Sequence, residues 1–460
     1  MTIERVLVAN RGEIAVRIVR ACRAEGIDVI VAVSDADHDS LAARLATDVV
    51  HIGPASPAQS YLRVEQIVAG ALLSGCDAVH PGYGFLSERA ELAEACARHG
   101  LAFVGPPAAT IRRGGDKVEA RRVARAAGVP TGAGSESVGS VDAAAAVAAD
   151  IGYPVLLKAA AGGGGRGMVR VDTPDALVAR FGTASSEAKA AFGDGRMYVE
   201  RYVERARHVE VQLLGDHHGN VVHLGDRDCS TQRRFQKLVE EAPAAVLSDD
   251  LRRRIAAAAV ALGRRLDYRG AGTVEFLVDL DRDEFSFLEI NTRIQVEHPV
   301  TEQVTGIDIV RQQIRIAAGD PMGFDQDDVT ISGHAIECRI NAESVGDGFL
   351  PSPGVITHWE PPTDPWVRVD SHGFAGYEVP PHYDSLIAKL IVTGTDRSEA
   401  IARSLRALDD FRIAGIATTR SLHRDVLSHD DFRTDAITTQ WLETTFLPGW
   451  SPDCTTHVTT

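Results

Sequence analysis

Two glutamates, Glu275 and Glu289, lie in the adjacent β-rich runs TVEFLVDL and EFSFLEIN. The short polar turn at residues 281–283 between these runs predicts a hairpin in which the two glutamates face each other. Carboxylates opposed across a strand pair repel each other. A divalent cation between them removes that repulsion, and Mg²⁺ is typically held by one or two carboxylates together with phosphates. The alternative is a solvated hairpin face.

Alternation along the two strands divides the hairpin into an apolar and a polar face. The expected apolar face consists of Phe276, Val278, Leu280, Leu288 and Ile290. The expected polar face carries Thr273, Glu275, Glu289, Asn291 and Arg293, and the polar series continues through Gln295 to Glu297. A wet sheet face does not need such a dense polar series, so the pattern favours a functional site over a solvated surface.

A glycine-rich stretch follows a second predicted strand, which ends in Lys158. The segment 152–171, GYPVLLKAAAGGGGRGMVRV, predicts strand, loop and strand, whereas a Walker A loop requires a helix after its lysine. Backbone N–H groups of such a loop can wrap a polyphosphate. The alternative is a hairpin without a ligand, but four adjacent glycines are entropically costly and favour a function.

Lysine is rare in this chain, with five lysines among 48 basic residues. A compact ammonium is expected where a guanidinium fork cannot replace it. Lys117 opens a predicted helix, where it either favours phosphate binding or is simply solvated. Lys237 lies in the segment 227–243, RDCSTQRRFQKLVEEAP, which either binds an anion or forms an ordinary helix surface. The others are Lys158, Lys189 and Lys389.

The elements that position these residues begin with strand–helix alternation up to about residue 113. This βαβ pattern predicts a Rossmann-like parallel sheet. The Gly-x-Gly-x-x-Gly fingerprint is absent after the first strand, which argues against a dinucleotide site. The loop HPGYGFLSE should place Tyr83 and Glu88 near the carboxyl end of a strand, where ligand sites are common, although an ordinary turn has the same composition.

Length and composition indicate a globular chain of about three packed units. The net charge of -16 and the lack of a basic block argue against nucleic acid as a partner. Six scattered cysteines fit a reducing cytoplasm, and no signal peptide or membrane-spanning run is apparent.

Seven ordered motifs together resemble those of biotin carboxylases, the ATP-grasp component of biotin-dependent carboxylases. They are HPGYGFLSE, KAAAGGGGRGM, RDCSTQRRFQK, EFLVDL with FLEINTRIQVEHPVTE, GHAIECRINAE, FLPSPG and PPHYDSLIAKL. The resemblance implies an α/β ATP-grasp fold with four parts. These are a Rossmann-like N-terminal domain (1–113), an ATP-grasp domain (114–330) with a glycine-rich lid at about 132–203, a biotin carboxylase C-terminal domain (331–447) and a tail (448–460).

The resemblance also implies a role for each matching residue. The implied ATP site consists of Lys117, Lys158, Gly164, Gly165, Glu200, Arg201, Tyr202, Val203, His208, Gln232, Glu275 and Glu289. Glu275, Glu289 and Asn291 are the implied ligands of Mg²⁺ or Mn²⁺. Lys237, Arg293, Gln295, Val296 and Glu297 are implied to bind bicarbonate, with Lys237, Arg293, Glu297 and Arg339 catalytic. Tyr83 and Arg339 are implied to bind biotin.

The implied reaction is carboxylation of biotin with ATP and bicarbonate through carboxyphosphate, with Glu297 as the base. It is the first half-reaction of an acyl-CoA carboxylase in fatty acid or propionyl-CoA metabolism. No Met-Lys-Met-like attachment segment is present, so biotin is expected on a separate carrier protein, and a carboxyltransferase subunit and a homodimer are expected partners.

Phe235 departs from the family pattern, which more often has a polar residue such as His or Asn there, and ATP affinity is expected to suffer. Two alternatives remain open. One is another ATP-grasp acyl-phosphate ligase, of the carbamoyl-phosphate synthetase or purine-pathway type. The other is an inactive nucleotide-binding regulatory subunit, which would require the loss of a catalytic residue.

Overall fold

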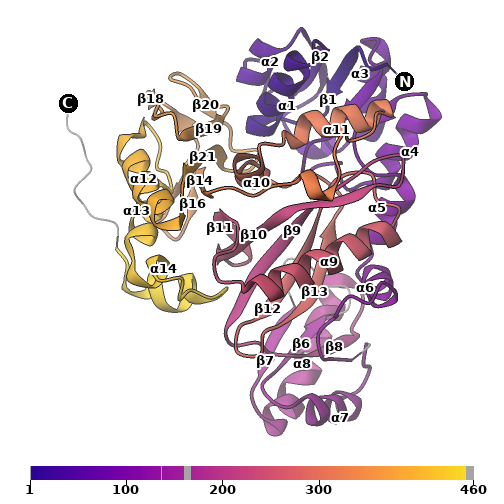
Figure 1. The fold of residues 1–460 in the computed structure, drawn as a ribbon, viewed down its shortest axis with the longest axis vertical. Helices are drawn as coiled ribbons and strands as arrows, with labels where there is room; N and C mark the ends of the chain where they lie inside the picture. Colours follow the sequence, from indigo (N-terminus) through magenta and orange to yellow (C-terminus); the bar gives the residue numbers. More distant parts are fainter. Residues whose placement is uncertain (1, 136, 160–166, 452–460) are drawn as a thin grey trace.

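The first part of the chain forms a five-stranded parallel sheet with helices on both faces (Figure 1). The computed structural model describes residues 2–135, 137–159 and 167–451. The strands have the order β3-β2-β1-β4-β5. They are β1 (Arg5–Val8), β2 (Asp28–Ser34), β3 (Asp48–Gly53), β4 (Ala78–His80) and β5 (Ala102–Phe103). The accompanying helices are α1 (Gly12–Ala24), α2 (Leu41–Leu45), η1 (Pro57–Gln59), α3 (Val64–Leu73), α4 (Ala90–Arg98) and α5 (Ala108–Gly115).

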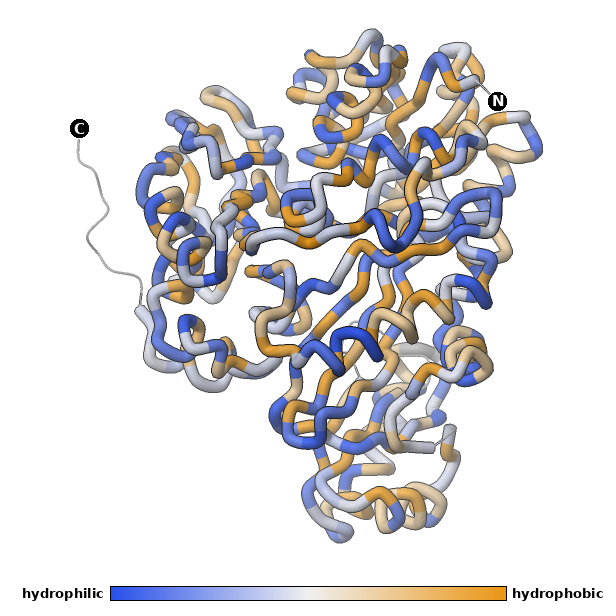
Figure 2. Tube along the Cα trace, in the orientation of Figure 1, coloured by the Kyte–Doolittle hydropathy of each residue, from blue (hydrophilic) through white to orange (hydrophobic). Residues whose placement is uncertain are grey.

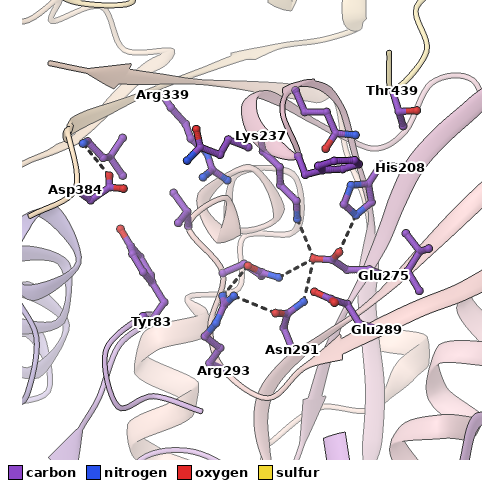
Figure 3. Close-up of a pocket in the computed structure, with 18 of the residues that line it drawn as sticks. Tyr83, His208, Lys237, Glu275, Glu289, Asn291, Arg293, Arg339, Asp384 and Thr439 are labelled. Carbon is purple, nitrogen blue, oxygen red and sulfur yellow. Dashed lines mark hydrogen bonds and ion pairs between the residues drawn. The ribbon is translucent and has the colours of Figure 1, made fainter. Parts of the chain in front are cut away.

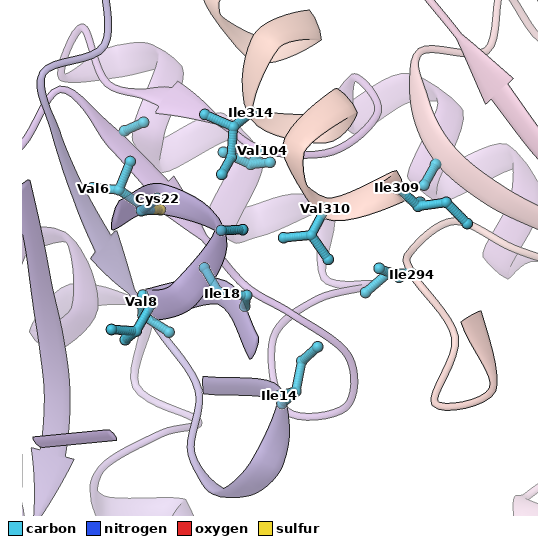
Figure 4. Packing of buried hydrophobic residues seen from close by; sticks show 14 of the residues in the cluster. Val6, Val8, Ile14, Ile18, Cys22, Val104, Ile294, Ile309, Val310 and Ile314 are labelled. Carbon is cyan, nitrogen blue, oxygen red and sulfur yellow. The ribbon is translucent and has the colours of Figure 1, made fainter. Parts of the chain in front are cut away.

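Strand β1 shows how alternation builds the two faces of this sheet. Val6 and Val8 belong to a cluster with α1 and with α11 (Ile309–Ala318), which returns from much later in the chain (Figure 4). Leu7 points to the opposite face and packs with residues of α3 and α4. The predicted Rossmann-like parallel sheet is therefore confirmed.

A small three-stranded sheet of order β7-β6-β8 projects at one end of the molecule (Figure 1). It contains β6 (Val155–Ala159), β7 (Met168–Val171) and β8 (Met197–Arg201), with α7 (Val141–Ile151) and α8 (Pro174–Phe192) packed on it. Helix α6 (Lys117–Ala126) begins at Lys117, as predicted, with the Asp116 side chain capping its first turn. Strands β6 and β7 flank the glycine-rich segment and pair antiparallel, which confirms the two predicted strands, whereas residues 160–166 between them lie outside the described residues.

The central element is an eight-stranded antiparallel sheet of order β13-β12-β9-β10-β11-β14-β21-β19. Its strands are β9 (Ala206–Gly215), β10 (Val221–Arg233), β11 (Gln236–Ala242), β12 (Gly270–Asp279), β13 (Glu284–Asn291), β14 (His334–Asn341), β19 (Val367–Ser371) and β21 (Leu386–Gly394). Helix α9 (Asp249–Arg265) packs on one face through Leu251, Ile255 and Leu262. Figure 2 shows hydrophobic stretches along the strands and a strongly hydrophilic start of α9.

The last part of the chain contributes strands β14, β21 and β19 to one end of this sheet. Its helices pack against the same end. Helices α12 (Arg397–Asp410), α13 (Arg420–Ser428) and α14 (Asp430–Arg433) contribute to one core with these strands. The remaining short elements are η2 (Gln326–Asp328), β15 (Glu343–Ser344), β16 (Leu350–Pro351), β17 (Gly354–Val355), β18 (His358–Glu360), β20 (Glu378–Val379), β22 (Arg412–Ala414), η3 (Leu442–Phe446) and η4 (Leu447–Gly449). No helix within the described ranges is long and apolar enough to span a membrane.

Two expectations about local structure were wrong. Leu288 does not lie on the apolar hairpin face, because a β-bulge between the pairs Glu275–Glu289 and Phe276–Phe287 makes it an extra residue. Phe287 is buried in the core instead, and Leu288 lines a cavity. The segment 227–243 is also not a helix surface, because it forms the antiparallel strands β10 and β11 around a turn at Arg234 and Phe235.

Candidate active site

A cavity of about 960 Å³ is lined by residues of the N-terminal unit, the small sheet, the central sheet and the last part of the chain. Figure 3 shows some of these residues. It gathers residues from distant parts of the chain, from Asn10 to Gln440. The sequence-predicted residues that line it are Tyr83, Lys117, Lys158, Glu200, Tyr202, Val203, His208, Gln232, Lys237, Glu275, Glu289, Asn291, Arg293, Gln295, Val296 and Arg339.

Glu275 is the centre of the polar network in this cavity, and it lies opposite Glu289 as predicted. Its Oε1 atom accepts hydrogen bonds from Lys237 Nζ at 3.0 Å, Asn291 Nδ2 at 2.9 Å and Gln295 Nε2 at 3.2 Å. Its Oε2 atom lies 2.9 Å from His208 Nε2. Figure 3 shows these side chains converging from neighbouring strands.

The two opposed glutamates have opposite electrostatic environments. Burial disfavours ionisation of Glu275, but Lys237 and His208 outweigh it and hold the pKa of this carboxyl well below its usual value. Burial and the negative charge of Glu275 both raise the pKa of Glu289. Lys117 Nζ, at 3.9 Å from Glu289 Oε2, compensates only part of this.

Lys237 joins this network to a second acid, Glu297, which directly precedes α10 (His298–Thr305). Lys237 Nζ lies 2.7 Å from Glu297 Oε1 and 2.6 Å from Glu210 Oε2. Arg339 Nη2 donates to the other oxygen of Glu297 at 2.9 Å. Burial opposes ionisation of Glu297, but Lys237, Arg339 and Arg227 together hold its pKa well below the usual value. Glu297 is therefore a carboxylate that can accept a proton.

Arg293 is fixed by four oxygen acceptors in the same region, one of which is the Ile294 carbonyl at 3.1 Å from Nη1. Its Nε donates to Glu88 Oε2 at 3.0 Å, its Nη1 to Gln295 Oε1 at 2.7 Å and its Nη2 to Asn291 Oδ1 at 3.0 Å. Glu88 comes from the loop after β4, and Tyr83 of the same loop lines the cavity.

At the small-sheet side of the cavity, a glutamate is shared by two cations. Lys158 Nζ lies 2.5 Å from Glu200 Oε2, and Arg121 pairs with the other oxygen of Glu200. Burial of Glu200 favours protonation, but Lys158 and Arg121 lower its pKa. These residues come from β6, β8 and α6, so the pairing ties the small sheet to the rest of the site.

Four of the predicted site residues are not among the described residues that line the cavity. Glu297 is fully buried beneath the cavity and does not line it. The Arg201 side chain is not among the lining residues and pairs with Glu284 at 3.5 Å. Gly164 and Gly165 lie outside the described residues, so their predicted role in ATP binding stays a prediction.

Sequence reasoning missed several residues that support the site. Glu210 contacts Lys237 and the fully buried Arg227, and its alternation with His208 and Gln212 was a usable signal. Lys389 was noticeable in the sequence as one of only five lysines, but its contacts were not predicted. Its Nζ donates to the Val296 carbonyl at 2.8 Å and lies 3.1 Å from Glu13 Oε2, and Glu13 in turn accepts from the Tyr83 hydroxyl.

The hairpin glutamates fit a hard divalent cation. Glu275, Glu289 and Asn291 offer oxygen donors on one face of the β12–β13 pair, and such donors suit Mg²⁺ or Mn²⁺. Burial and the negative charge of Glu275 raise the pKa of Glu289, so the pair of glutamates carries more negative charge than its surroundings compensate. A bound cation would compensate it.

Comparison with known protein families covers most of the chain. Residues 2–111 match the family model "Biotin carboxylase, N-terminal domain", and residues 337–444 match "Biotin carboxylase C-terminal domain". The intervening residues 116–324 match "Carbamoyl-phosphate synthase L chain, ATP binding domain".

Individual relatives agree over nearly full length. The chain is 50% identical over 444 residues to the biotin carboxylase of Nostoc sp., which covers 96% of this chain and 99% of that protein. It is 48% identical over 443 residues to biotin carboxylase 1 of Bacillus subtilis, covering 96% and 98%.

Solved structures give the same result. A biotin carboxylase complex with β,γ-ATP from Campylobacter jejuni has a TM-score of 0.91 at 46% identity and covers 96% of this chain and 98% of that one. The biotin carboxylase domain dimer of the Hydrogenobacter thermophilus 2-oxoglutarate carboxylase, solved with MgADP, ADP and bicarbonate, has a TM-score of 0.89 at 44% identity with the same coverage. With its parallel N-terminal sheet and antiparallel central sheet, this chain belongs to the biotin carboxylase family.

Proposed function

We propose that this enzyme carboxylates biotin, using ATP and bicarbonate, while biotin is carried on a separate carrier protein. The observation that carries this proposal is the contact of the buried Glu297 with both Lys237 and Arg339, two residues that line the cavity above it. A proton acceptor, a cation for the phosphoryl group and a cation for the carboxyl acceptor are thus held together.

We assign the nucleotide to the small-sheet side of the cavity. Lys117 and Lys158 are cations suited to phosphates, and Tyr202, His208 and Gln232 line the space between them and β11. Glu200 keeps Lys158 in place. Glu275, Glu289 and Asn291 would hold Mg²⁺, which supplies charge neutralisation and orientation of the phosphate oxygens when bound.

Bicarbonate is assigned to the space beside Arg293, Gln295 and the Val296 backbone. In the first step the bicarbonate O–H gives its proton to the Glu297 carboxylate while its oxygen attacks the γ-phosphorus, which releases ADP and forms carboxyphosphate. Lys237 and Arg293 stabilise negative charge that develops during this transfer. Burial opposes ionisation of Glu297, but Lys237 and Arg339 outweigh it and lower the pKa of this carboxyl. The residue is therefore ionised before it accepts the proton.

Biotin is assigned to the side of the cavity that carries Arg339 and Tyr83, which Figure 3 shows on the same side. Carboxyphosphate separates into CO₂ and phosphate, and the phosphate takes the ureido N–H proton of biotin. The guanidinium of Arg339 donates to the ureido oxygen as it becomes an oxyanion, and the nitrogen then attacks CO₂.

The remaining assignments concern partners and organisation. A biotin carrier protein, a carboxyltransferase and a second copy of this chain are the proposed partners, and a dimeric relative supports the last. The domain boundaries near residues 113 and 330 and the cytoplasmic location also stay proposals. The location is supported by the free thiols of five cysteines, Cys22, Cys76, Cys96, Cys229 and Cys338.

The two alternative functions are disfavoured. Because every predicted catalytic residue is present, an inactive regulatory subunit is disfavoured, and the two flanking family matches disfavour another ATP-grasp ligase.

ADP release from the purified protein tests the proposal. With MgATP and bicarbonate, free biotin should stimulate turnover, and Glu297→Ala should abolish it while still binding ATP. Glu187→Ala, which removes an exposed glutamate on α8, is the matched control. Turnover that does not respond to biotin would contradict the proposal and favour another ATP-grasp ligase.

A further inference from the structure

A second pair of glutamates lies beneath the cavity, on strands that are not adjacent in sequence. Glu240 on β11 and Glu337 on β14 are direct cross-strand partners in the antiparallel register. Both side chains are fully buried. Two ionised carboxylates in this arrangement would repel strongly, because little water is available to screen them.

The two acids differ in their partners. Glu240 Oε1 accepts from Arg339 at 2.5 Å, so one cation is committed to it. Within the described part of the chain, neither oxygen of Glu337 has a hydrogen-bond partner, and the same is true of Glu240 Oε2. A buried carboxylate without a donor is far more costly than a buried neutral carboxylic acid. A carboxylic acid on Glu337 would also supply a proton donor beside a free acceptor oxygen.

The charged groups around the pair agree with a single proton. Arg339 follows Glu337 by two residues on β14, Glu297 approaches from the loop before α10, and Lys237 lies on β11. Lys389 on the neighbouring strand β21 is already engaged by Val296 and Glu13. Burial raises the pKa of Glu337 well above its usual value, although Lys389 and Arg339 oppose this. His298 is fully buried, and burial and Lys389 hold its pKa well below the usual value, so it brings no positive charge.

We propose that Glu240 is the positioning residue of Arg339 and that Glu337 is a neutral carboxylic acid that shares one proton with Glu240. Arg339 therefore lies between Glu297 and the Glu240–Glu337 pair, which together carries one negative charge. If Glu337 were also ionised, a further negative charge near Arg339 would weaken the stabilisation that its guanidinium gives to an oxyanion on the substrate. The protonated pair thus keeps Arg339 both fixed and cationic towards the carboxyl acceptor. This inference rests on the proposed function through the role of Arg339.

Matched glutamine substitutions separate the two acids. Glu337→Gln replaces a neutral group by a neutral isostere, so KM for free biotin should change by less than about threefold. Glu240→Gln removes the anion that holds Arg339, and KM for biotin should rise by about tenfold or more, with a smaller change in KM for ATP. Circular dichroism and thermal melting check that both variants fold. If Glu240→Gln does not fold, Glu240→Asp, which withdraws the carboxylate from Arg339 but keeps its charge, replaces it.

Infrared spectroscopy of the wild-type protein and Glu337→Gln tests the proton directly and needs no activity. The carbonyl band of a buried protonated carboxylic acid should be present at neutral pH and be lost in Glu337→Gln. A spectrum unchanged by Glu337→Gln would overturn the inference, as would a loss of biotin affinity in Glu337→Gln equal to that of Glu240→Gln. Failure of the proposed function is distinguishable, because wild-type turnover would then not respond to biotin while the infrared result would stand.

Discussion

Lys237 Nζ lies 2.7 Å from Glu297 Oε1, and the lysine side chain is only 11% exposed. The same ammonium also contacts Glu210 and Glu275. Burial alone would lower the pKa of Lys237, but its acidic neighbours raise it well above the usual value, so the cation is permanent. One lysine therefore holds the proposed base ionised and joins it to the hairpin that carries the proposed metal ligands.

Lys237→Met should impair both chemistry and folding. The substitution removes a cation from the site of phosphoryl transfer, and kcat should fall by about 10²–10³-fold. It also leaves three buried carboxylates without their shared partner, which should cost about 3 kcal/mol of the free energy of unfolding. ADP release and urea unfolding measure the two effects. Lys189→Met, at an exposed lysine on α8, is the matched control and should change neither quantity; wild-type kcat in a folded Lys237→Met protein would refute the assigned role.

Phe235→Asn should stabilise the protein and improve ATP binding. Phe235 has φ +65° at the β10–β11 turn and is 56% exposed at the cavity. Asparagine tolerates this left-handed conformation better, so the free energy of unfolding should rise by about 0.5–1 kcal/mol. An added polar side chain should lower KM for ATP about two- to fivefold. Phe235→Ala keeps the strain without the ring or the amide, and a higher KM in both variants would show instead that the ring itself binds the nucleotide.

The hairpin shows what the sequence predicts and where it stops. Period-two alternation placed Glu275 opposite Glu289 because side-chain direction in a strand is a local property. The bulge at Leu288 was missed, because a bulge depends on how two strands pair and leaves no mark in one of them. The polar series 291–297 was likewise visible, whereas the full burial of Glu297 beside Lys237 and Arg339 was not, because these two partners come from other strands.

Contacts between distant elements account for most of what remained hidden. Lys389 was conspicuous as a rare lysine, but its partner Glu13 lies on α1, near the other end of the chain. Glu240 and Glu337 meet only because β11 and β14 are neighbours in the sheet despite the two strands between them in sequence. Sheet order of this kind is set by packing of the whole domain, which local propensities do not encode.

Lys389→Met should weaken bicarbonate binding. The fully buried Lys389 fixes the Val296 carbonyl at 2.8 Å, and the backbone beside it is part of the assigned bicarbonate site. Loss of this charged hydrogen bond should raise KM for bicarbonate about tenfold, with a smaller effect on KM for ATP. Steady-state kinetics with varied bicarbonate checks this. Equal changes in both KM values would indicate a general loss of structure and would contradict a specific role at Val296.

Acid should destabilise the protein through buried histidines before most carboxylates titrate. Burial lowers the pKa of His372 to about 3, and Arg11 adds to this effect. Because the unfolded residue titrates near pH 6.5, the unfolded state binds more protons below that value, and stability falls as pH decreases from about 6.5 towards the folded pKa. Between pH 6.5 and 5.5 this one group should reduce the free energy of unfolding by about 1 kcal/mol.

His372→Phe isolates this contribution, because the ring packs edge-on against Tyr377 at 5.2 Å and an aromatic replacement keeps that contact. Urea unfolding at the two pH values should show that the variant loses about 1 kcal/mol less than the wild type, since it has no proton to gain on unfolding. His38→Phe, which replaces a histidine whose side chain is 69% exposed, is the matched control. An identical pH dependence in wild type and His372→Phe would mean that His372 is protonated in the folded protein, and the buried positive charge would then need an anionic partner beside Arg11.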